Sequence, residues 1–314
     1  MGETHVFFIR HGESIDDVSR GQYVPCYLLK PMLLVVILKV VYSAGPPDSP
    51  LTSHGVIQSN LLGAHLAGRM ASLGLVPHLF CSDFQQARMT AEAIRDAYVP
   101  NQTAGPSSAS TPVIEIIQLG ELREKQFRER TQEASKSAAA AQHGGEAYTE
   151  GEPSEEVNAR AKRFLDAVLI PLLEDLLLSD APQCVFIVAH GGIHSHLWLQ
   201  FVRVLRALQV PTLSTAGIMR LELVPLDEFL SNAAYHEVVL NAKRVASKTR
   251  TSPQPTVSCY AGEALSAAQV TFVAVNCVDH LSGLKKTGGG IGNSKFDKKQ
   301  RKIDSFFVSQ NRRT

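Results

Sequence analysis

Two histidines in this chain each stand directly after a short apolar run. Residues 6–9 lead into Arg10 and His11, and residues 184–189 lead into His190. A neutral imidazole can attack phosphorus, and a guanidinium can bind phosphate oxygens through its planar fork of donors. Transfer of a phosphoryl group needs such a nucleophile and such a cradle, together with a proton for the leaving oxygen. These residue types therefore indicate phosphoryl transfer.

Strands alternate with helices along most of the chain, which predicts right-handed crossovers and helices on both faces of a sheet. The predicted fold class is α/β, a three-layer α/β/α sandwich with a mostly parallel central sheet. Active sites of such sheets lie at the carboxyl ends of strands, so we expect His11 and His190 to meet there. We expect strands at 6–9, 78–83, 113–117, 184–190, 218–224 and 270–276, and helices at about 53–74, 85–97, 157–178 and 193–208.

The composition is that of a globular protein with a sizeable core. The 314 residues are 44% hydrophobic and 19% charged, and the formal net charge of +1 points to no particular partner. Five cysteines lie far apart, and no pair has the spacing of a CxxC motif. Widely spaced reduced thiols favour a cytoplasmic protein, or a nuclear one, over a disulfide framework.

The segment RHGES at 10–14 resembles the signature of the histidine phosphatase superfamily, whose fold is phosphoglycerate mutase-like. Four further segments resemble motifs of that family in the same order along the chain. The resemblance covers about residues 4–224, and the strand at 270–276 completes the expected sheet. The four segments are DSPLTSHG (48–55), CSDFQQARMTAEAI (81–94), LREKQF (122–127) and VAHGG (188–192).

The resemblance implies a catalytic role for four side chains. His11 would attack phosphorus and form a phosphohistidine, while Arg10 and His190 would bind the phosphate oxygens. Glu124 would protonate the leaving alkoxide and then activate the water that hydrolyses the phosphohistidine. Glu121, three residues earlier, competes for this role, and the Leu-x-Glu pattern of the family selects Glu124.

The expected phosphate cradle includes backbone as well as side chains. Gly12 and Gly191 let backbone amides approach a phosphate closely, at loops that lead toward helix N-termini. Ser14 and Asp17 complete the loop after the nucleophile, and Asp17 stands where many members of the family have Asn. An acidic side chain at that position places negative charge near the phosphate.

The chain departs from the family pattern at the second phosphate-binding arginine. Counting from Ser82 in the Ser-x-x-x-Arg pattern places Gln86 at that position. Arg88 is the nearby substitute, but two positions along a helix turn a side chain by about 200°. Loss of one arginine from the cradle lowers the expected rate on the order of 10²-fold.

The resemblance implies that no metal or cofactor takes part, because side chains supply the positive charge. His190, His194 and His196 form a histidine-rich segment that could suggest a metal site. We expect His194 and His196 to lie on different faces of the helix that follows, which disfavours that interpretation.

Three functions remain open at this point. A phosphatase that acts on a small phosphorylated substrate is favoured, because the basic and Tyr residues that follow the acid in the mutase subgroup have no match around Phe127. A phosphoglycerate mutase-type phosphotransferase is the second. A non-catalytic interaction protein that retains the fold is the third, and Gln86 favours it.

We expect a catalytic domain at residues 1–280 and a basic, flexible tail at 281–314. Residues 135–151 are rich in Ala, Gly and polar residues, which predicts a mobile surface loop. Residues 25–42 are nearly all apolar and have three interpretations: a buried or surface-packed insertion, a membrane-associating patch, or a segment foreign to the fold. The uninterrupted run at 32–38 is far shorter than the ~20 residues that cross a bilayer, so we expect no membrane span.

The tail carries a short motif of its own. The segment QRKIDSFF (300–307) resembles the peptide that docks on the DNA sliding clamp. One helical turn would place its apolar side chains on one side, with a glutamine as hydrogen-bonding anchor. The alternative is an amphipathic tail that packs on its own domain, and direct nucleic acid binding is not expected. The motif residues are Gln300, Ile303, Phe306 and Phe307.

Overall fold

Six strands form one mixed sheet in the order β3-β2-β4-β1-β5-β6. β1, β2, β3 and β4 are mutually parallel, whereas β5 runs antiparallel to both of its neighbours. The predicted α/β fold with a mostly parallel sheet is therefore confirmed. The computed structural model describes residues 3–19, 48–98, 114–125, 152–208, 230–242, 263–285 and 291–296. The strands are β1 (Glu3–Arg10), β2 (Val76–Ser82), β3 (Ile116–Leu119), β4 (Gln183–Ala189), β5 (Tyr235–Ala242) and β6 (Ala268–Cys277).

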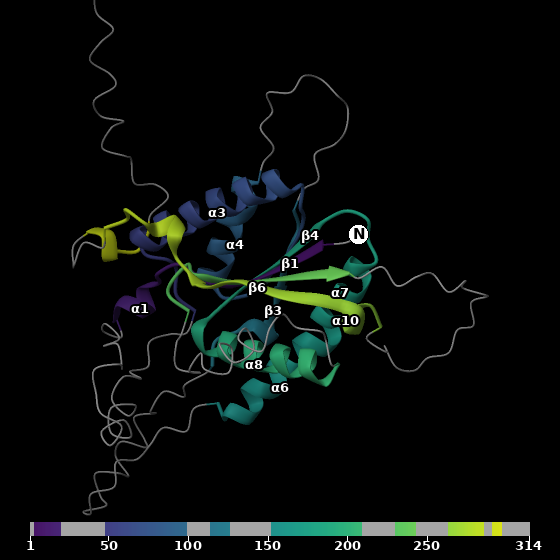
Figure 1. Ribbon diagram of the computed structural model, residues 1–314. Coiled ribbons are helices and arrows are strands. Elements are labelled where there is room, and N and C mark those ends of the chain that lie inside the picture. Colours follow the sequence, from purple (N-terminus) through teal and green to yellow (C-terminus); the bar gives the residue numbers. More distant parts are fainter. Residues whose placement is uncertain are drawn as a thin grey trace, which may run out of the picture.

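Helices cover both faces of this sheet, as the three-layer prediction requires (Figure 1). The helices α3 (Ser53–Leu73) and α4 (Gln85–Ala97) lie on one face. The opposite face carries α6 (Ser154–Phe164), the π-helical turn η3 (Leu165–Leu169), α7 (Ile170–Leu177), α8 (Gly191–Ala207) and α10 (Glu263–Ala267). The shorter elements are α1 (Ile15–Ser19), η2 (Gly120–Leu122), η4 (Asp279–Leu281) and η5 (Ile291–Asn293).

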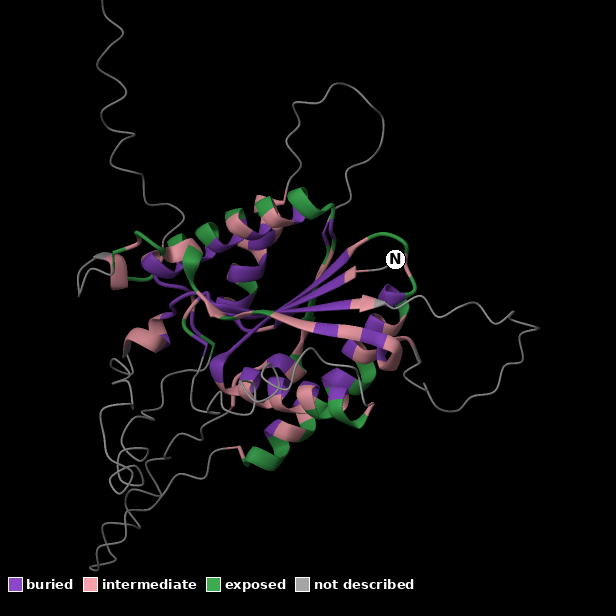
Figure 2. Ribbon diagram, in the orientation of Figure 1, coloured by how far each residue is buried: buried purple, intermediate pink, exposed green. Residues whose placement is uncertain are grey.

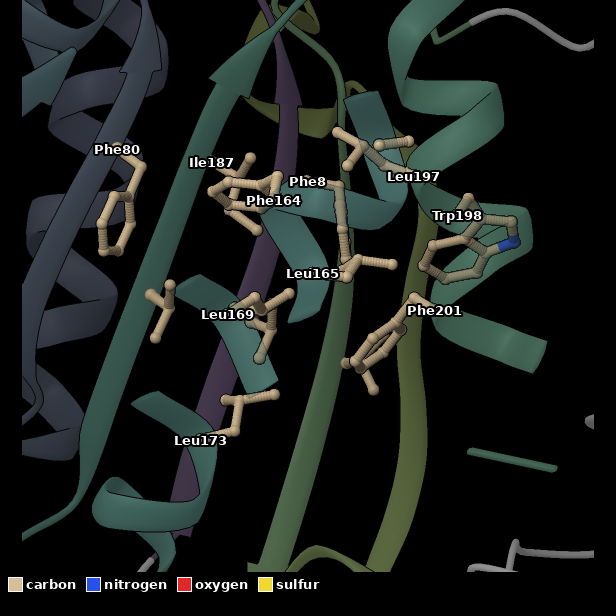
Figure 3. Close-up of a cluster of buried hydrophobic side chains, with 14 of the residues drawn as sticks. Phe8, Phe80, Phe164, Leu165, Leu169, Leu173, Ile187, Leu197, Trp198 and Phe201 are labelled. Atoms are coloured by element: carbon tan, nitrogen blue, oxygen red, sulfur yellow. The ribbon is translucent and has the colours of Figure 1, made fainter. Parts of the chain in front are cut away.

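The central strand β1 divides the core into two clusters. Its side chains alternate in direction, so Val6 and Phe8 pack toward α7 and α8, while Phe7 and Ile9 pack toward α3 and α4. Figure 2 shows the central strands buried and the exposed residues on the outer sides of the helices. Figure 3 shows Phe8 among large apolar side chains from α6, η3 and α8. Burial of each such side chain stabilises the fold by roughly 1.5–3 kcal/mol.

The bounds of the helices on one face follow from local sequence signals. The side chain of Thr52 caps α3 by accepting a hydrogen bond from the amide of Gly55, at 2.9 Å. The same helix ends at Leu73 and is capped by Gly74, whose φ of 64° is left-handed and favours glycine. The second helix, α4, spans the predicted residues 85–97.

Several elements differ from the sequence-based predictions. The strand predicted at 113–117 is found at 116–119, as β3. Its bounds are set by pairing with β2, which runs from Leu79 opposite Ile116 to Ser82 opposite Leu119. The long helix begins at Ser154 rather than at residue 157 and includes the π-helical turn. The helix predicted at 193–208 begins at Gly191.

β5 was not predicted. A charged residue, Glu237, lies in the middle of this strand and is fully buried. Its carboxylate accepts hydrogen bonds from His5 on β1 at 2.8 Å and from Arg69 on α3 at 2.5 Å. These partners come from distant parts of the chain, so the local sequence gave no sign that an acidic residue could be buried there.

Several predicted segments lie outside the described residues. They are the apolar stretch 25–42, the loop 135–151, the strand predicted at 218–224 and the clamp-like motif 300–307. Within the part of the chain that the structure describes, no helix has the length and apolar character to cross a membrane.

A short part of the tail contacts the domain. Ser53 at the start of α3 donates its amide to the carbonyl of Ser294 at 3.0 Å, and Lys295 forms an antiparallel bridge with Thr52. The residue before Thr52, Leu51, forms a second antiparallel bridge, with Ser14 in the loop after β1. Three short stretches from distant parts of the chain therefore lie side by side next to the carboxyl end of β1.

Candidate active site

The sheet brings His11 and His190 together, as predicted. β1 and β4 are neighbouring parallel strands with Arg10 opposite Ala189, so the residues that follow each strand meet at one edge. The amide of His11 donates to the carbonyl of Ala189 at 3.0 Å. The two imidazole rings lie with centroids 4.9 Å apart, and both are buried.

The hydrogen bond made by His11 identifies the ring nitrogen that can react. Nδ1 of His11 lies 2.7 Å from the carbonyl oxygen of Gly12. A carbonyl oxygen only accepts, so Nδ1 carries the proton in this contact. A neutral His11 then has its lone pair on Nε2, and this is the tautomer that a nucleophile requires.

His190 is held in its neutral form. Burial lowers its pKa well below the usual value, and the positive charge of Arg10 lowers it further. Nε2 of His190 lies 2.9 Å from the hydroxyl oxygen of Ser82, at the end of β2. Its Nδ1 is buried and has no hydrogen-bond partner among the described residues.

Two of the three guanidinium nitrogens of Arg10 have hydrogen-bond partners. Nη1 donates to the carbonyl of Leu230 and Nη2 to Oδ1 of Asp17, both at 2.8 Å. Nε of Arg10 is buried without a hydrogen-bond partner among the described residues. An unsatisfied buried donor is costly, so a bound anion would satisfy Nε of Arg10. It would also satisfy Nδ1 of His190 in the tautomer that carries its proton there and accepts from the Ser82 hydroxyl at Nε2.

Asp17 neutralises Arg10 and engages the loop after β1. Burial raises its pKa, but the charge of Arg10 and hydrogen bonds from Ser14 outweigh burial and hold the pKa below the usual value. The hydroxyl of Ser14 donates to Oδ2 of Asp17 at 2.8 Å, and Asn232 donates to the same oxygen at 3.0 Å. The structure thus brings Ser14 and Asp17 to the site, where they bind each other.

Gly12 has a packing role that the sequence did not reveal. Its amide donates to the hydroxyl of Thr90 on α4 at 3.1 Å, so the amide already has a partner. A Cβ at this position would lie 2.5 Å from the carbonyl oxygen of Gly55 and 2.6 Å from the hydroxyl of Ser59. Gly12 is therefore needed for the close approach of the loop to α3.

Glu124 lies at the N-terminus of α8. Its Oε2 accepts from the amide of Gly192 at 3.2 Å, and its Oε1 accepts from the amide of Lys125 at 2.8 Å. His190 is the N-cap of α8, and Gly191 is its first residue. The carboxylate thus lies beside Gly192, the second residue after His190, at the helix N-terminus. A helix N-terminus stabilises negative charge. Of the two carboxylates considered, Glu124 is the one with this placement.

Gln86 and Arg88 lie on different sides of α4. Gln86 is buried, one helical turn before Thr90, whose hydroxyl binds the backbone carbonyl of Gln86 and accepts from the amide of Gly12. Arg88 is exposed and lies 3.9 Å from the carboxylate of Glu92 on the same helix. The structure therefore brings Gln86 toward the site and does not bring Arg88 there.

A family model for the histidine phosphatase superfamily, branch 1, matches residues 38–225, which is more than half of the chain. The chain belongs to this superfamily. The match includes Glu124 and His190 and begins after β1. The place of Arg10 and His11 in the site therefore depends on the geometry described above.

Several solved structures are similar to this superfamily member. A phosphoglycerate mutase from Bacillus anthracis str. Sterne is 15% identical over 90% of this chain and 96% of its own, with a TM-score of 0.48. A mycobacterial glucosyl-3-phosphoglycerate phosphatase is 18% identical over 76% of this chain and 90% of its own, with a TM-score of 0.43. A phosphoserine phosphatase from Entamoeba histolytica is 16% identical over 75% of this chain and 90% of its own, with a TM-score of 0.40. No curated protein matches the chain.

The two histidines within α8, His194 and His196, have different hydrogen-bond partners. Nε2 of His194 donates to the carbonyl of Ile9 at 2.7 Å, and His196 bonds with the side chain of Asn158 at 2.9 Å. In the described ranges, no group of three or more His, Cys, Asp or Glu residues could hold a metal ion.

Sequence reasoning missed several residues of the site. Ser82 and Thr90 both lie within the segment that carried the resemblance. Their hydroxyls, however, have their partners in the residues that follow β4 and β1, His190 and Gly12. Asn232 and Leu230 reach the site from the segment before β5, which the sequence analysis did not use. Their signal is tertiary, because no spacing along the chain connects them to Arg10.

Proposed function

We propose that this superfamily member is a phosphomonoesterase that acts through a phosphohistidine on His11. Nε2 of His11 attacks phosphorus while the bond to the ester oxygen breaks, and Glu124 gives its proton to the leaving alkoxide. Glu124 then takes a proton from water, the water oxygen attacks phosphorus, and the bond to Nε2 breaks. Inorganic phosphate and neutral His11 result.

One observation carries this proposal most directly. Nδ1 of His11 faces the carbonyl of Gly12, which leaves the lone pair of a neutral ring on Nε2, and the second histidine lies 4.9 Å from its ring. The buried donors Arg10 Nε and His190 Nδ1 support binding of an anion beside that nitrogen. In this proposal Arg10 and His190 bind phosphate oxygens, and Glu124 moves the protons.

An assay of the full chain against small phosphomonoesters tests the proposal. Sugar phosphates, nucleotides and phosphoserine form the panel, and His11→Ala is compared with His78→Ala, a half-buried histidine at the other end of the sheet. We expect release of phosphate that His11→Ala abolishes and His78→Ala retains. Rapid quenching should trap an acid-labile phosphate on His11, and a chelator should leave the rate unchanged. Full activity of His11→Ala would overturn the proposal, and isomerisation without release of phosphate would favour a mutase.

A second candidate is a phosphate-binding protein with weakened catalysis. The ion pair of Arg10 with Asp17 removes net positive charge from the site, and Gln86 occupies the buried face of α4 that points toward it. Such a protein would bind phosphate or a phosphorylated ligand without turnover. Calorimetric binding of inorganic phosphate by a chain that hydrolyses none of the panel would favour this candidate.

The tail motif is a separate proposal about partners. Residues 300–307 resemble a clamp-docking peptide and lie outside the described residues. A synthetic peptide of residues 295–314 should bind the sliding clamp with micromolar affinity, and alanine at both Phe306 and Phe307 should abolish binding. Absence of binding, together with loss of domain stability on deletion of 295–314, would show that the tail packs on its own domain.

A further inference from the structure

A single arginine on α6 holds the segment that carries Glu124. Nη1 of Arg160 donates to the carbonyls of Glu121 and Arg123, both at 3.0 Å. Its Nη2 donates to the carbonyl of Glu124 at 3.5 Å. One side chain therefore fixes three carbonyls within four residues, at the backbone from which the proposed acid extends.

The opposite edge of the same guanidinium is fixed by a carboxylate. Nε and Nη2 of Arg160 donate to the two oxygens of Glu152 at 2.7 and 2.8 Å, the bidentate geometry that suits arginine. The side chains of this pair are 14% and 11% exposed, so the pair is screened little by water. Because Glu152 compensates its charge, Arg160 is suited to holding backbone rather than to binding a substrate anion.

The carboxylate of Glu124 has two anchors of its own. It accepts hydrogen bonds from the amides of Lys125 and Gly192. The second amide belongs to the first turn of α8, where amides have no partner within the helix. The position of the carboxylate thus depends on the backbone of residues 121–124 lying at the right distance from α8.

We infer that Arg160, together with Glu152, is a positioning residue that holds the backbone of residues 121–124 so that the Glu124 carboxylate lies at the N-terminus of α8. The inference rests on the proposed function for its catalytic consequence. A displaced Glu124 protonates the leaving oxygen poorly. The rate at which the leaving group departs then falls far more for a basic leaving group, such as an alkyl alcohol. It falls less for a leaving group that departs as a stable anion, such as nitrophenolate.

A comparison of two substrates tests this consequence. Because hydrolysis of the phosphohistidine is common to both substrates, the comparison uses kcat/KM, which reports the step in which the leaving group departs. Arg160→Gln should lower kcat/KM for glycerol phosphate by about 10- to 100-fold and kcat/KM for 4-nitrophenyl phosphate by no more than about threefold. Glu124→Gln should show the same selectivity, and the double variant should lose little more than Glu124→Gln alone. The matched control is Arg163→Gln, an exposed position on the same helix, which should leave both rates unchanged. Equal losses on the two substrates, or none, would overturn the inference.

Hydrogen exchange provides a readout that does not depend on activity. The amides of Lys125 and Gly192 are protected by the Glu124 carboxylate itself, so they should exchange faster in Arg160→Gln while the amides of β4 stay unchanged. Unchanged exchange at both amides would overturn the inference. A wild-type chain that hydrolyses neither substrate would overturn the proposed function instead, and faster exchange at the two amides would still support the positioning role.

Discussion

The two halves of the candidate site are held by different means. Arg10, His11 and His190 extend from neighbouring strands, so the hydrogen-bond ladder of the sheet fixes their backbone. Glu124 lies on a short segment after β3, and the side chain of Arg160 fixes its backbone. We call Arg10, His11 and His190 the sheet-held half and the segment of Glu124 the loop-held half. The sheet-held half depends on many backbone hydrogen bonds, whereas the loop-held half depends on a few side chains. A single substitution far from the chemistry can therefore displace the proposed acid but not the proposed nucleophile.

Exposure to water also separates the halves. The histidines and Arg10 are buried, whereas the segment of Glu124 lies near the surface. Arg123, in that segment, pairs with Asp83 and lies over the ring of Phe84, but its side chain is 43% exposed. A pair so exposed contributes little to stability, typically up to about 1 kcal/mol. The pair of Arg160 with Glu152, which is much less exposed, is thus the stronger support of the loop-held half.

The largest expected effect comes from Gly192, the residue at which the two halves touch. A Cβ at this position would overlap Oε1 of Glu124. The carboxylate is the far end of a flexible side chain and can swing away, so Gly192→Ala should lower kcat by about 10²- to 10³-fold with little change in stability. Steady-state kinetics and thermal unfolding measure the two effects.

Gly68→Ala is the matched control for this substitution. Gly68 is an exposed residue within α3, and a Cβ there would meet no atom within 4 Å. This variant should keep full activity and gain about 0.5–1 kcal/mol of stability, since alanine favours a helix. If Gly192→Ala also kept full activity, contact between the halves would not position the acid.

Acid should weaken the sheet-held half through the histidines packed behind it. Burial lowers the pKa of His194 to about 3 and that of His236 to about 4. The folded protein keeps both neutral, whereas the unfolded chain takes up protons below about pH 6.5. Stability is therefore complete above pH 6.5 and falls as the pH drops toward the folded values, by about 2 kcal/mol for each histidine at pH 5.

Urea unfolding at pH 7.5 and pH 5 measures this effect. His236→Gln should show a smaller difference between the two pH values, because a glutamine can accept the same hydrogen bond from the amide of Asn276 without titrating. A urea midpoint that is independent of pH over this range would mean that these imidazoles are not held neutral.

The smallest expected effect concerns the charge of the sheet-held half. Gln86 lies buried on the face of α4 that contacts the loop after β1. In Gln86→Arg, a second guanidinium would reach the phosphate and should raise kcat/KM by about tenfold. Arg88→Gln, at the exposed position two residues along, should change kcat/KM by less than about twofold. A rate that stays the same or falls in Gln86→Arg would show that this position does not serve the phosphate.

Part of this architecture could be predicted from the sequence, because its signals are local. The apolar run of β4 and the glycine that ends α3 each depend on residues close together in the chain. The convergence of His11 and His190 followed from one general property of parallel sheets, that the carboxyl ends of neighbouring strands meet.

The remaining features depend on partners far away in the sequence. The buried Glu237 of β5 needs His5 and Arg69, and the acid-bearing segment needs Arg160, 36 residues beyond Glu124. The amide of Gly12 was expected to face a phosphate, but it binds Thr90, 78 residues away. In each case the side chain looked ordinary in its local context, and only the fold supplied its partner.

The order of the strands has a consequence for synthesis of the chain. β1 lies in the middle of the sheet, but it is translated first, and its neighbours β4 and β5 are translated much later. His5 bonds with Glu237, 232 residues further on. At 5–20 residues per second, that interval is roughly 12 to 46 s. Until β4 is made, Val6, Phe7, Phe8 and Ile9 have neither strand to pair with, and β5 follows later still. The nascent chain therefore presents an apolar segment to chaperones while these strands are awaited.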